Sequence, residues 1–229
     1  MKLPKSFRPE KDLDSKIKDL LSSESLVYDP GAVEDLLDVG EYFLEQELDN
    51  YEGFYHVGVG LVKGLKYDLK DVEELSKKIK QGQNKRLGVY LSALINKKIT
   101  EKDTITLTLE EELNGVGMYL QKGTLIINGN VNNSIGWGMK DGKLIVKGNA
   151  YDYTGWCMEG GEVVVKGNAN DNTGCYMKGG ELVVEGDVND FTGFDMAGGE
   201  LVVEGRISSI SDLFKKGVIM EGGKTRRDC

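Results

Sequence analysis

The most constraining feature of this sequence is a glycine-rich unit that repeats every 19 residues along its second half. Two sets of residues recur at this interval without a slip: Gly129, Gly148, Gly167, Gly186 and Gly205, and Met139, Met158, Met177 and Met196. Hairpins tolerate loops of variable length, whereas a fixed period requires every unit to occupy an equivalent place. Stacked turns of a coil meet that requirement, with neighbouring turns paired at the ordinary inter-strand spacing of about 4.8 Å.

Each unit holds one short run of Leu, Ile and Val with glycines on both sides, which is typical of a strand. The run is too short for a helix, and the units leave no room for a crossover helix between strands. We therefore predict a parallel β-helix with one strand in each 19-residue turn. The predicted domain spans residues 103–229, with five to six turns from about residue 115 and a C-terminal cap.

The stacked turns bring equivalent side chains into columns. Side chains alternate between the two faces of a strand, and the charged ends of the run 162–166 must face solvent. The predicted inward columns are Leu125, Leu144, Val163, Leu182 and Leu201, and Ile127, Val146, Val165, Val184 and Val203. The methionine column is predicted to fill the opposite wall.

The middle column of the strands is predicted to face outward. It consists of Ile126, Ile145, Val164, Val183 and Val202. One interpretation is an exposed β-branched ladder. The other is an apolar strip that is covered by the N-terminal half or by a further protein chain.

Both ends of such a coil expose unpaired strand edges, which need covers. The segment "SSISDLFKKG" (208–217) interrupts the last turn, and we predict that it forms a capping helix. The first end is predicted to be closed by the residues that precede Gly115.

Residues 1–102 show no repeat and predict a mainly α-helical domain, so the chain as a whole is predicted to be α+β. Apolar stripes predict helices in 11–21 (Leu13, Ile17, Leu20, Leu21), in 31–48, in 69–79 after an Asp68 N-cap (Leu69, Val72, Leu75, Ile79) and in 84–98 (Leu87, Leu91, Leu94, Ile95). The alternation of Ile105, Leu107 and Leu109 predicts a strand leading into the coil. The segment "FYHVGVGLVKG" (54–64) fits a strand or a loop.

The charge distribution limits the possible partners. The net charge of −9 disfavours a protein that binds nucleic acid over its whole surface. Residues 63–102 nevertheless hold 11 Lys and Arg against five Asp and Glu. Two helices about a glycine turn in this segment permit a helix-turn-helix reading, although Lys78 falls where that motif places a small residue. The alternative is a solvated basic surface, or one docked on acidic side chains of the coil.

No uncharged apolar stretch approaches the roughly 18 residues that cross a membrane, and the first residues lack the apolar core of a secretion signal. Three cysteines do not make a disulfide framework. We therefore expect a cytoplasmic protein.

Few residues suggest chemistry. The only histidine, His56, has no defined companion, and a bridge between Cys157 and Cys175 is doubtful because their side chains point in opposite directions. Two carboxylate columns (Asp152, Asp171, Asp190; Glu162, Glu181, Glu200) are expected to be turn caps and a solvated ridge, and an amide column (Asn130, Asn149, Asn168) to stack inside a corner. We therefore predict no catalytic, cofactor-binding or metal-binding residue.

The stretch "GNANDNTGCYMKGGELVVEGDVNDFTGFDMAGGELVVEG" resembles the GXGXG domain, which is found in the large chain of glutamate synthase and in the glycine-repeat component of formylmethanofuran dehydrogenase. The resemblance covers about residues 115–205. It implies a right-handed parallel β-helix with a structural role, which spaces and docks catalytic domains that carry flavin, iron–sulfur or metal centres. It carries no catalytic residue to this chain. The sequence departs from the family in lacking a processed cysteine nucleophile, a flavin domain and a cysteine-rich cluster motif.

These observations predict a non-catalytic scaffold subunit, or a stand-alone GXGXG protein, associated with a multi-subunit oxidoreductase of the formylmethanofuran dehydrogenase or split glutamate synthase kind. The expected docking surfaces are the outward aliphatic column and the basic helical head. One alternative is a homo-oligomeric regulatory or binding module whose basic head binds nucleic acid. Another is an independent enzyme with its site between head and coil, near His56.

Overall fold

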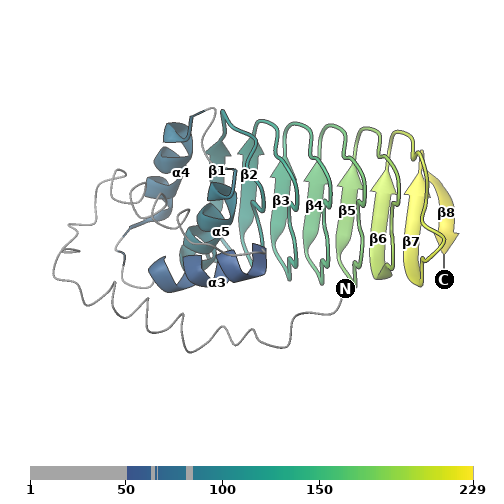
Figure 1. Ribbon diagram of the computed structural model, residues 1–229, viewed down its shortest axis with the longest axis horizontal. Helices are drawn as coiled ribbons and strands as arrows, with labels where there is room; N and C mark the ends of the chain where they lie inside the picture. The colour runs from purple at the N-terminus through teal and green to yellow at the C-terminus, as the bar shows by residue number, and fades with distance from the viewer. Residues whose placement is uncertain (1–50, 63–64, 66, 81–84, 229) are drawn as a thin grey trace.

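The structure is a computed structural model that describes residues 51–62, 65, 67–80 and 85–228. Three helices come first: α3 (Tyr51–Leu61), α4 (Leu69–Lys78) and α5 (Leu87–Lys98). The strands follow: β1 (Thr104–Thr108), β2 (Thr124–Asn128), β3 (Lys143–Val146), β4 (Glu162–Val165), β5 (Glu181–Val184), β6 (Ala197–Val203), β7 (Lys216–Glu221) and β8 (Lys224–Asp228). The helices cluster at the β1 end, and the strands line up along the long axis in chain order (Figure 1). The helices predicted in 11–21 and 31–48 lie outside the described residues.

Strands β1 to β7 form a parallel β-solenoid with one strand per turn, as the repeat predicts. They pair in sequence order within one sheet, and β8 adds an antiparallel eighth strand. The four central intervals place Leu125, Leu144, Val163, Leu182 and Leu201 side by side at the 19-residue period. The first turn is 20 residues long, since Ile105 pairs with Leu125, and the last is 18, since Leu201 pairs with Ile219.

The predicted inward columns form the core of the coil. All ten of their side chains are 0% exposed, and so are Met139, Met158, Met177 and Met196. Two further buried columns were not predicted: Val131, Ala150, Ala169 and Val188, and Ile135, Thr154, Thr173 and Thr192. Each of these threonines donates its hydroxyl hydrogen bond to the carbonyl three residues earlier, as Thr154 does to Tyr151 at 3.0 Å. The hydroxyls of these threonines inside the coil are therefore satisfied locally.

The predicted asparagine column does form a ladder, but on the surface of a corner. The side-chain oxygen of Asn130 accepts the backbone N–H of Asn149 at 2.9 Å, and Asn149 accepts that of Asn168 in the same way. These side chains are exposed, so the prediction that they stack inside the corner was wrong. The bonds run from one turn to the backbone of the next, which ties neighbouring turns together.

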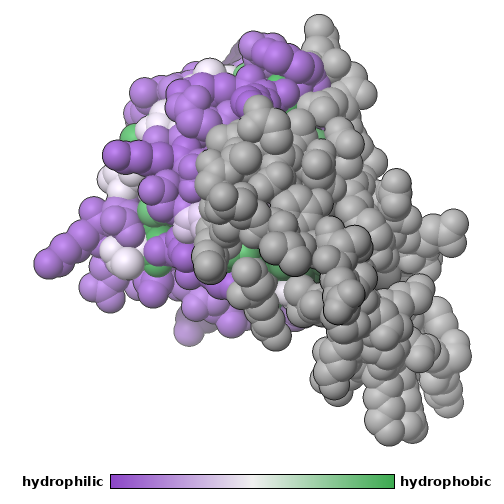
Figure 2. Space-filling model, turned by 90° about the vertical axis from the view of Figure 1, so that its left-hand side faces the viewer, coloured by the Kyte–Doolittle hydropathy of each residue, from purple (hydrophilic) through white to green (hydrophobic). Residues whose placement is uncertain are grey.

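Helix α5 plugs the first end of the coil. Its residues from Leu87 to Ile95 are all buried, and Ser92 Oγ accepts the N–H of Gly117 at 2.9 Å. A methyl group at Gly88 would lie 2.2 Å from the carbonyl oxygen of Asn114, so helix and first turn are in close contact. The outer surface described at this end is mostly hydrophilic (Figure 2).

Helix α3 packs on α5, and it overturns the reading of 54–64 as strand or loop. Its buried side chains include Tyr55 and Val57, with Leu61 one turn further on. The glycines at 58 and 60 disfavour a helix by local propensity. Burial of this apolar face against α5 outweighs that propensity, which is a tertiary effect that a local pattern does not contain.

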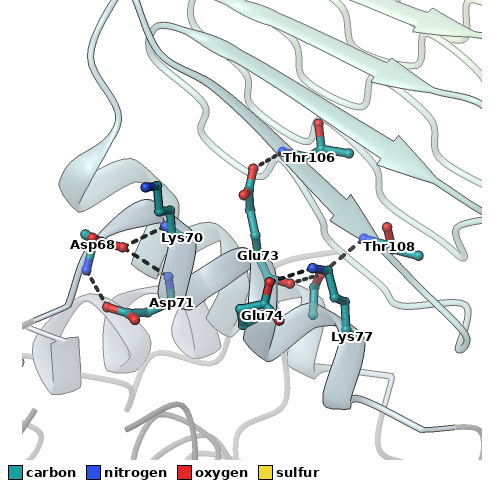
Figure 3. A network of polar contacts seen from close by, with 9 residues as sticks. Asp68, Lys70, Asp71, Glu73, Glu74, Lys77, Thr106 and Thr108 are labelled. Atoms are coloured by element: carbon teal, nitrogen blue, oxygen red, sulfur yellow. Dashed lines mark hydrogen bonds and ion pairs between the residues drawn. The ribbon is translucent and has the colours of Figure 1, made fainter. Parts of the chain in front are cut away.

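Helix α4 closes the open edge of β1. Asp68 caps the helix as predicted, accepting the N–H groups of Lys70 and Asp71. Further along, Glu73 accepts the N–H of Thr106 at 2.8 Å and Ser76 Oγ accepts that of Thr108 at 3.1 Å (Figure 3). The helix thus supplies acceptors where a preceding strand would otherwise stand.

Replacing Ser76 by alanine is expected to lower the free energy of unfolding by about 1–3 kcal/mol, because the N–H of Thr108 loses its acceptor. Ser76 is 0% exposed, so water cannot replace the hydroxyl without local opening. The matched control is Lys77→Ala, which removes only an exposed ion pair with Glu74 and is expected to cost at most about 0.5 kcal/mol. Chemical denaturation compares the two variants. Equal costs would show that α4 does not seal the edge.

The C-terminal cap is a hairpin, and the prediction of a capping helix at 208–217 was wrong. Residues 208–215 form no helix, and bridges at Val188–Ile207 and Thr192–Ile210 hold this segment to the turn before it. Strand β8 then folds back on β7 through Gly222 and Gly223. Its exposed basic side chains protect the final edge from pairing with another chain.

Candidate functional site

One corner of the coil has an unusual backbone conformation that repeats in five turns. It comprises residues 115–119, 134–138, 153–157, 172–176 and 191–195. The first, third and fifth residue of each segment have positive φ. All eight non-glycine residues with positive φ in the described chain lie here: Tyr119, Ser134, Tyr153, Cys157, Asn172, Tyr176, Phe191 and Asp195. Bulky residues rarely adopt this conformation, which costs about 1 kcal/mol or more for each.

The third position of each corner segment is always glycine, for a reason that the other two positions do not share. At Gly155 a Cβ atom would lie 2.8 Å from Leu182 Cδ2, inside the core. The first and fifth positions instead carry side chains such as Phe191 and Tyr176, which are exposed. The corner geometry therefore aims two columns of variable side chains away from the core.

Aromatic rings gather along this corner, and we call them the corner ridge: Tyr119, Trp137, Tyr153, Trp156, Tyr176, Phe191 and Phe194. Trp156 is at its centre. Its ring stacks on Trp137 and on Tyr153, with centroids 5.0 Å and 4.9 Å away. The row continues through Tyr176, 6.2 Å from Trp156, to Phe194, 5.5 Å from Tyr176. These linked rings come from four successive turns and form one continuous surface feature.

The ridge is covered at its first turn and open further along. Tyr55 of α3 meets Tyr119 edge-on at 4.9 Å. Burial, together with the nearby Glu52 carboxylate, raises the pKa of Tyr119 to about 12, so its hydroxyl stays protonated at neutral pH. At the other end Tyr176 is 39% exposed and Phe191 is 55% exposed. An apolar surface of this kind on an otherwise polar protein marks a binding site.

Sequence reasoning missed the ridge because its members do not form one column. They come from the first, fourth and fifth corner positions, which hold rings in some turns and small or polar residues in others. The available signal was the clustering of aromatic residues beside the third-position glycine in each unit.

The outward aliphatic column is present as predicted, but long charged side chains flank it. Lys143 Nζ lies 2.6 Å from Glu162 on one side, and Lys166 pairs with Glu185 on the other. Val164 between them is only 8% exposed. The five aliphatic side chains therefore present little apolar surface.

The residues considered for chemistry do not come together. His56 is exposed on α3, and its ring contacts Tyr55 at 6.1 Å. Within the described ranges, no group of three or more His, Cys, Asp and Glu side chains could hold a metal ion. The helix pair also lacks the form of a helix-turn-helix, since α5 has no exposed face from Leu87 to Ile95 that could enter a DNA groove.

The two central cysteines are free thiols, in agreement with the doubt about a bridge. Burial raises the pKa of Cys175 to about 12. The thiolate fraction at pH 8 is then about 10⁻⁴, and we expect Cys175 to react with iodoacetamide on the order of 1,000-fold more slowly than an unfolded thiol. Peptide mass spectrometry of native and guanidinium-unfolded protein measures both rates. Similar rates would contradict the burial of this thiol.

A scan of protein-family models finds no match to this chain, and a search of curated proteins finds none either. Helices in the described part of the chain are too short or too polar to cross a lipid bilayer. Membership of the GXGXG family therefore stays a prediction, and we infer the function from the geometry of the corner ridge.

Proposed function

We propose that this chain is a non-catalytic docking subunit whose coil holds a partner protein against the corner ridge. The observation that carries the proposal is the continuous row of stacked rings, open at Tyr176 and Phe191. Aromatic side chains dominate the binding energy of protein interfaces, because they bury a large area and lose little conformational freedom. The coil supports them with hydrogen bonds between turns, such as that from the N–H of Tyr176 to the carbonyl of Phe194 at 2.8 Å.

The partner that we propose is a catalytic subunit of a multi-subunit oxidoreductase, of the formylmethanofuran dehydrogenase or split glutamate synthase kind. The support is the resemblance of the 19-residue unit to the GXGXG domain, whose family role is to space catalytic domains. We place this role in the cytoplasm, where thiols such as Cys157 and Cys175 stay reduced. The aliphatic column is the second candidate surface.

The test is affinity capture from the source cells with full-length tagged protein. The ridge variant is Tyr176→Asn with Phe191→Asn, since asparagine tolerates positive φ and Asn172 already occupies the column of Phe191. The control is Val183→Thr in the aliphatic column. We expect the ridge variant to recover at least about tenfold less partner than the wild type, and the control to match the wild type.

Two results would count against the proposal. A wild-type protein that recovers only itself, and that is monomeric at its cellular concentration, would contradict the docking role. Loss of partner in Val183→Thr alone would move the docking surface to the aliphatic column.

A further inference from the structure

An acidic panel lies directly beside the corner ridge. It consists of residues 149–153, 168–172 and 187–191 in three successive turns. The panel contains four carboxylates and no lysine or arginine: Asp152, Asp171, Asp187 and Asp190. Asp152 stands between Tyr151, which is 39% exposed, and Tyr153, which stacks on Trp156. Asp190 immediately precedes Phe191.

Most of this negative charge is not neutralised by the protein. Of the four, Asp187 has a basic neighbour, with 4.0 Å between its carboxylate and the Arg206 guanidinium. Asp171 accepts the backbone N–H of Asp190 at 3.2 Å. Asp190 accepts the hydroxyls of Ser208 and Ser209, and these bonds lower its pKa, so it stays ionised at neutral pH. Neutral donors hold these carboxylates in place without cancelling their charge.

We infer that the ridge and the acidic panel together bind a basic segment of the partner protein. The inference rests on the docking role proposed above and names the chemistry of the segment that docks. Cationic side chains are attracted to the faces of exposed rings such as Tyr176, and carboxylates such as Asp152 accept paired hydrogen bonds from arginine. An acidic partner segment would meet only repulsion on this panel.

The spacing of the turns also suits an extended basic segment. Equivalent carboxylates in adjacent turns are about 4.8 Å apart, so Asp152 and Asp190 are separated by about 10 Å along the coil. Residues three apart in an extended chain span about 10 Å as well. Arginine is favoured over lysine, because its planar guanidinium can stack on a ring while it bonds to a carboxylate.

The experiment titrates fluorescein-labelled octa-arginine with full-length protein and follows its fluorescence anisotropy. The test variant is Asp152→Asn with Asp171→Asn. Asparagine is native to this column, where Asn133 accepts the N–H of Asp152 at 3.2 Å, so the ladder is kept and only charge is removed. The matched control is Glu181→Gln with Glu200→Gln, which removes two charges at the same 19-residue spacing from the strand face.

We expect the aspartate variant to weaken octa-arginine binding about tenfold or more, and the glutamate control to change it by less than about twofold. Phe191→Asn is expected to weaken it about threefold to tenfold at unchanged net charge, which separates ring contact from general attraction to an acidic protein. Equal weakening by the aspartate and glutamate pairs would overturn the inference. So would failure of the peptide to bind at millimolar protein, or indifference to Phe191→Asn.

The capture experiment distinguishes this inference from the docking role itself. A partner that is lost with the ridge variant but retained by Asp152→Asn with Asp171→Asn would overturn the basic segment and leave the docking role standing.

Discussion

Replacing Gly180 by alanine is expected to lower the free energy of unfolding by about 4 kcal/mol. Gly180 has a φ of +83°, which an alanine adopts only under strain. A Cβ atom there would also lie 2.7 Å from the carbonyl oxygen of Gly161 in the preceding turn. That oxygen belongs to the backbone and accepts the N–H of Glu181, so it cannot move aside without breaking the ladder.

The control for this prediction is Gly222→Ala in the β7–β8 hairpin. Gly222 also has positive φ, but no atom lies within 4 Å of the position that a Cβ would take. Only the conformational cost remains, about 1 kcal/mol. Guanidinium unfolding followed by circular dichroism measures both variants. If the two substitutions cost the same, close approach of successive turns is not what requires glycine in this column.

Replacing Leu182 by alanine is expected to cost about 3 kcal/mol. Leu182 is 0% exposed and is stacked between Val163 and Leu201 in the inward column. The turns above and below are fixed by the backbone ladder, so the cavity cannot collapse easily.

The neighbouring outward residue provides the comparison for Leu182. Val183→Ala removes methyl groups from a partly exposed side chain, and we expect a cost below about 1 kcal/mol. Thermal unfolding of the two variants under the same conditions measures the difference. A larger loss for Val183 than for Leu182 would place the strand faces the wrong way round.

The coil could be predicted in detail because its constraints are local and repeated. A single strand such as Glu162–Val165 is ambiguous alone, but the same alternation in adjacent units assigns the inward and outward faces of all of them. The helix after Asp68 was equally accessible, since its cap and apolar stripe both lie within one short segment.

The features that escaped prediction depend on contacts between segments distant in sequence or on backbone conformation. Helix α3 forms against α5 in spite of its glycines, and segment 208–217 follows the preceding turn instead of forming a helix. The corner ridge depends on positive φ at residues such as Tyr176, which the sequence does not reveal because glycine is the usual residue there. Once the corner conformation is known, the positions of the rings follow.

The central claim is that the corner ridge is the surface buried in the assembled complex. Hydroxyl-radical footprinting of full-length protein, alone and with its captured partner, tests it directly because aromatic side chains are readily oxidised. We predict that oxidation of Tyr176 and Phe191 falls by about fivefold or more on assembly, while residues of the C-terminal hairpin are unchanged. Equal oxidation of the ridge in the free and assembled protein would contradict the claim.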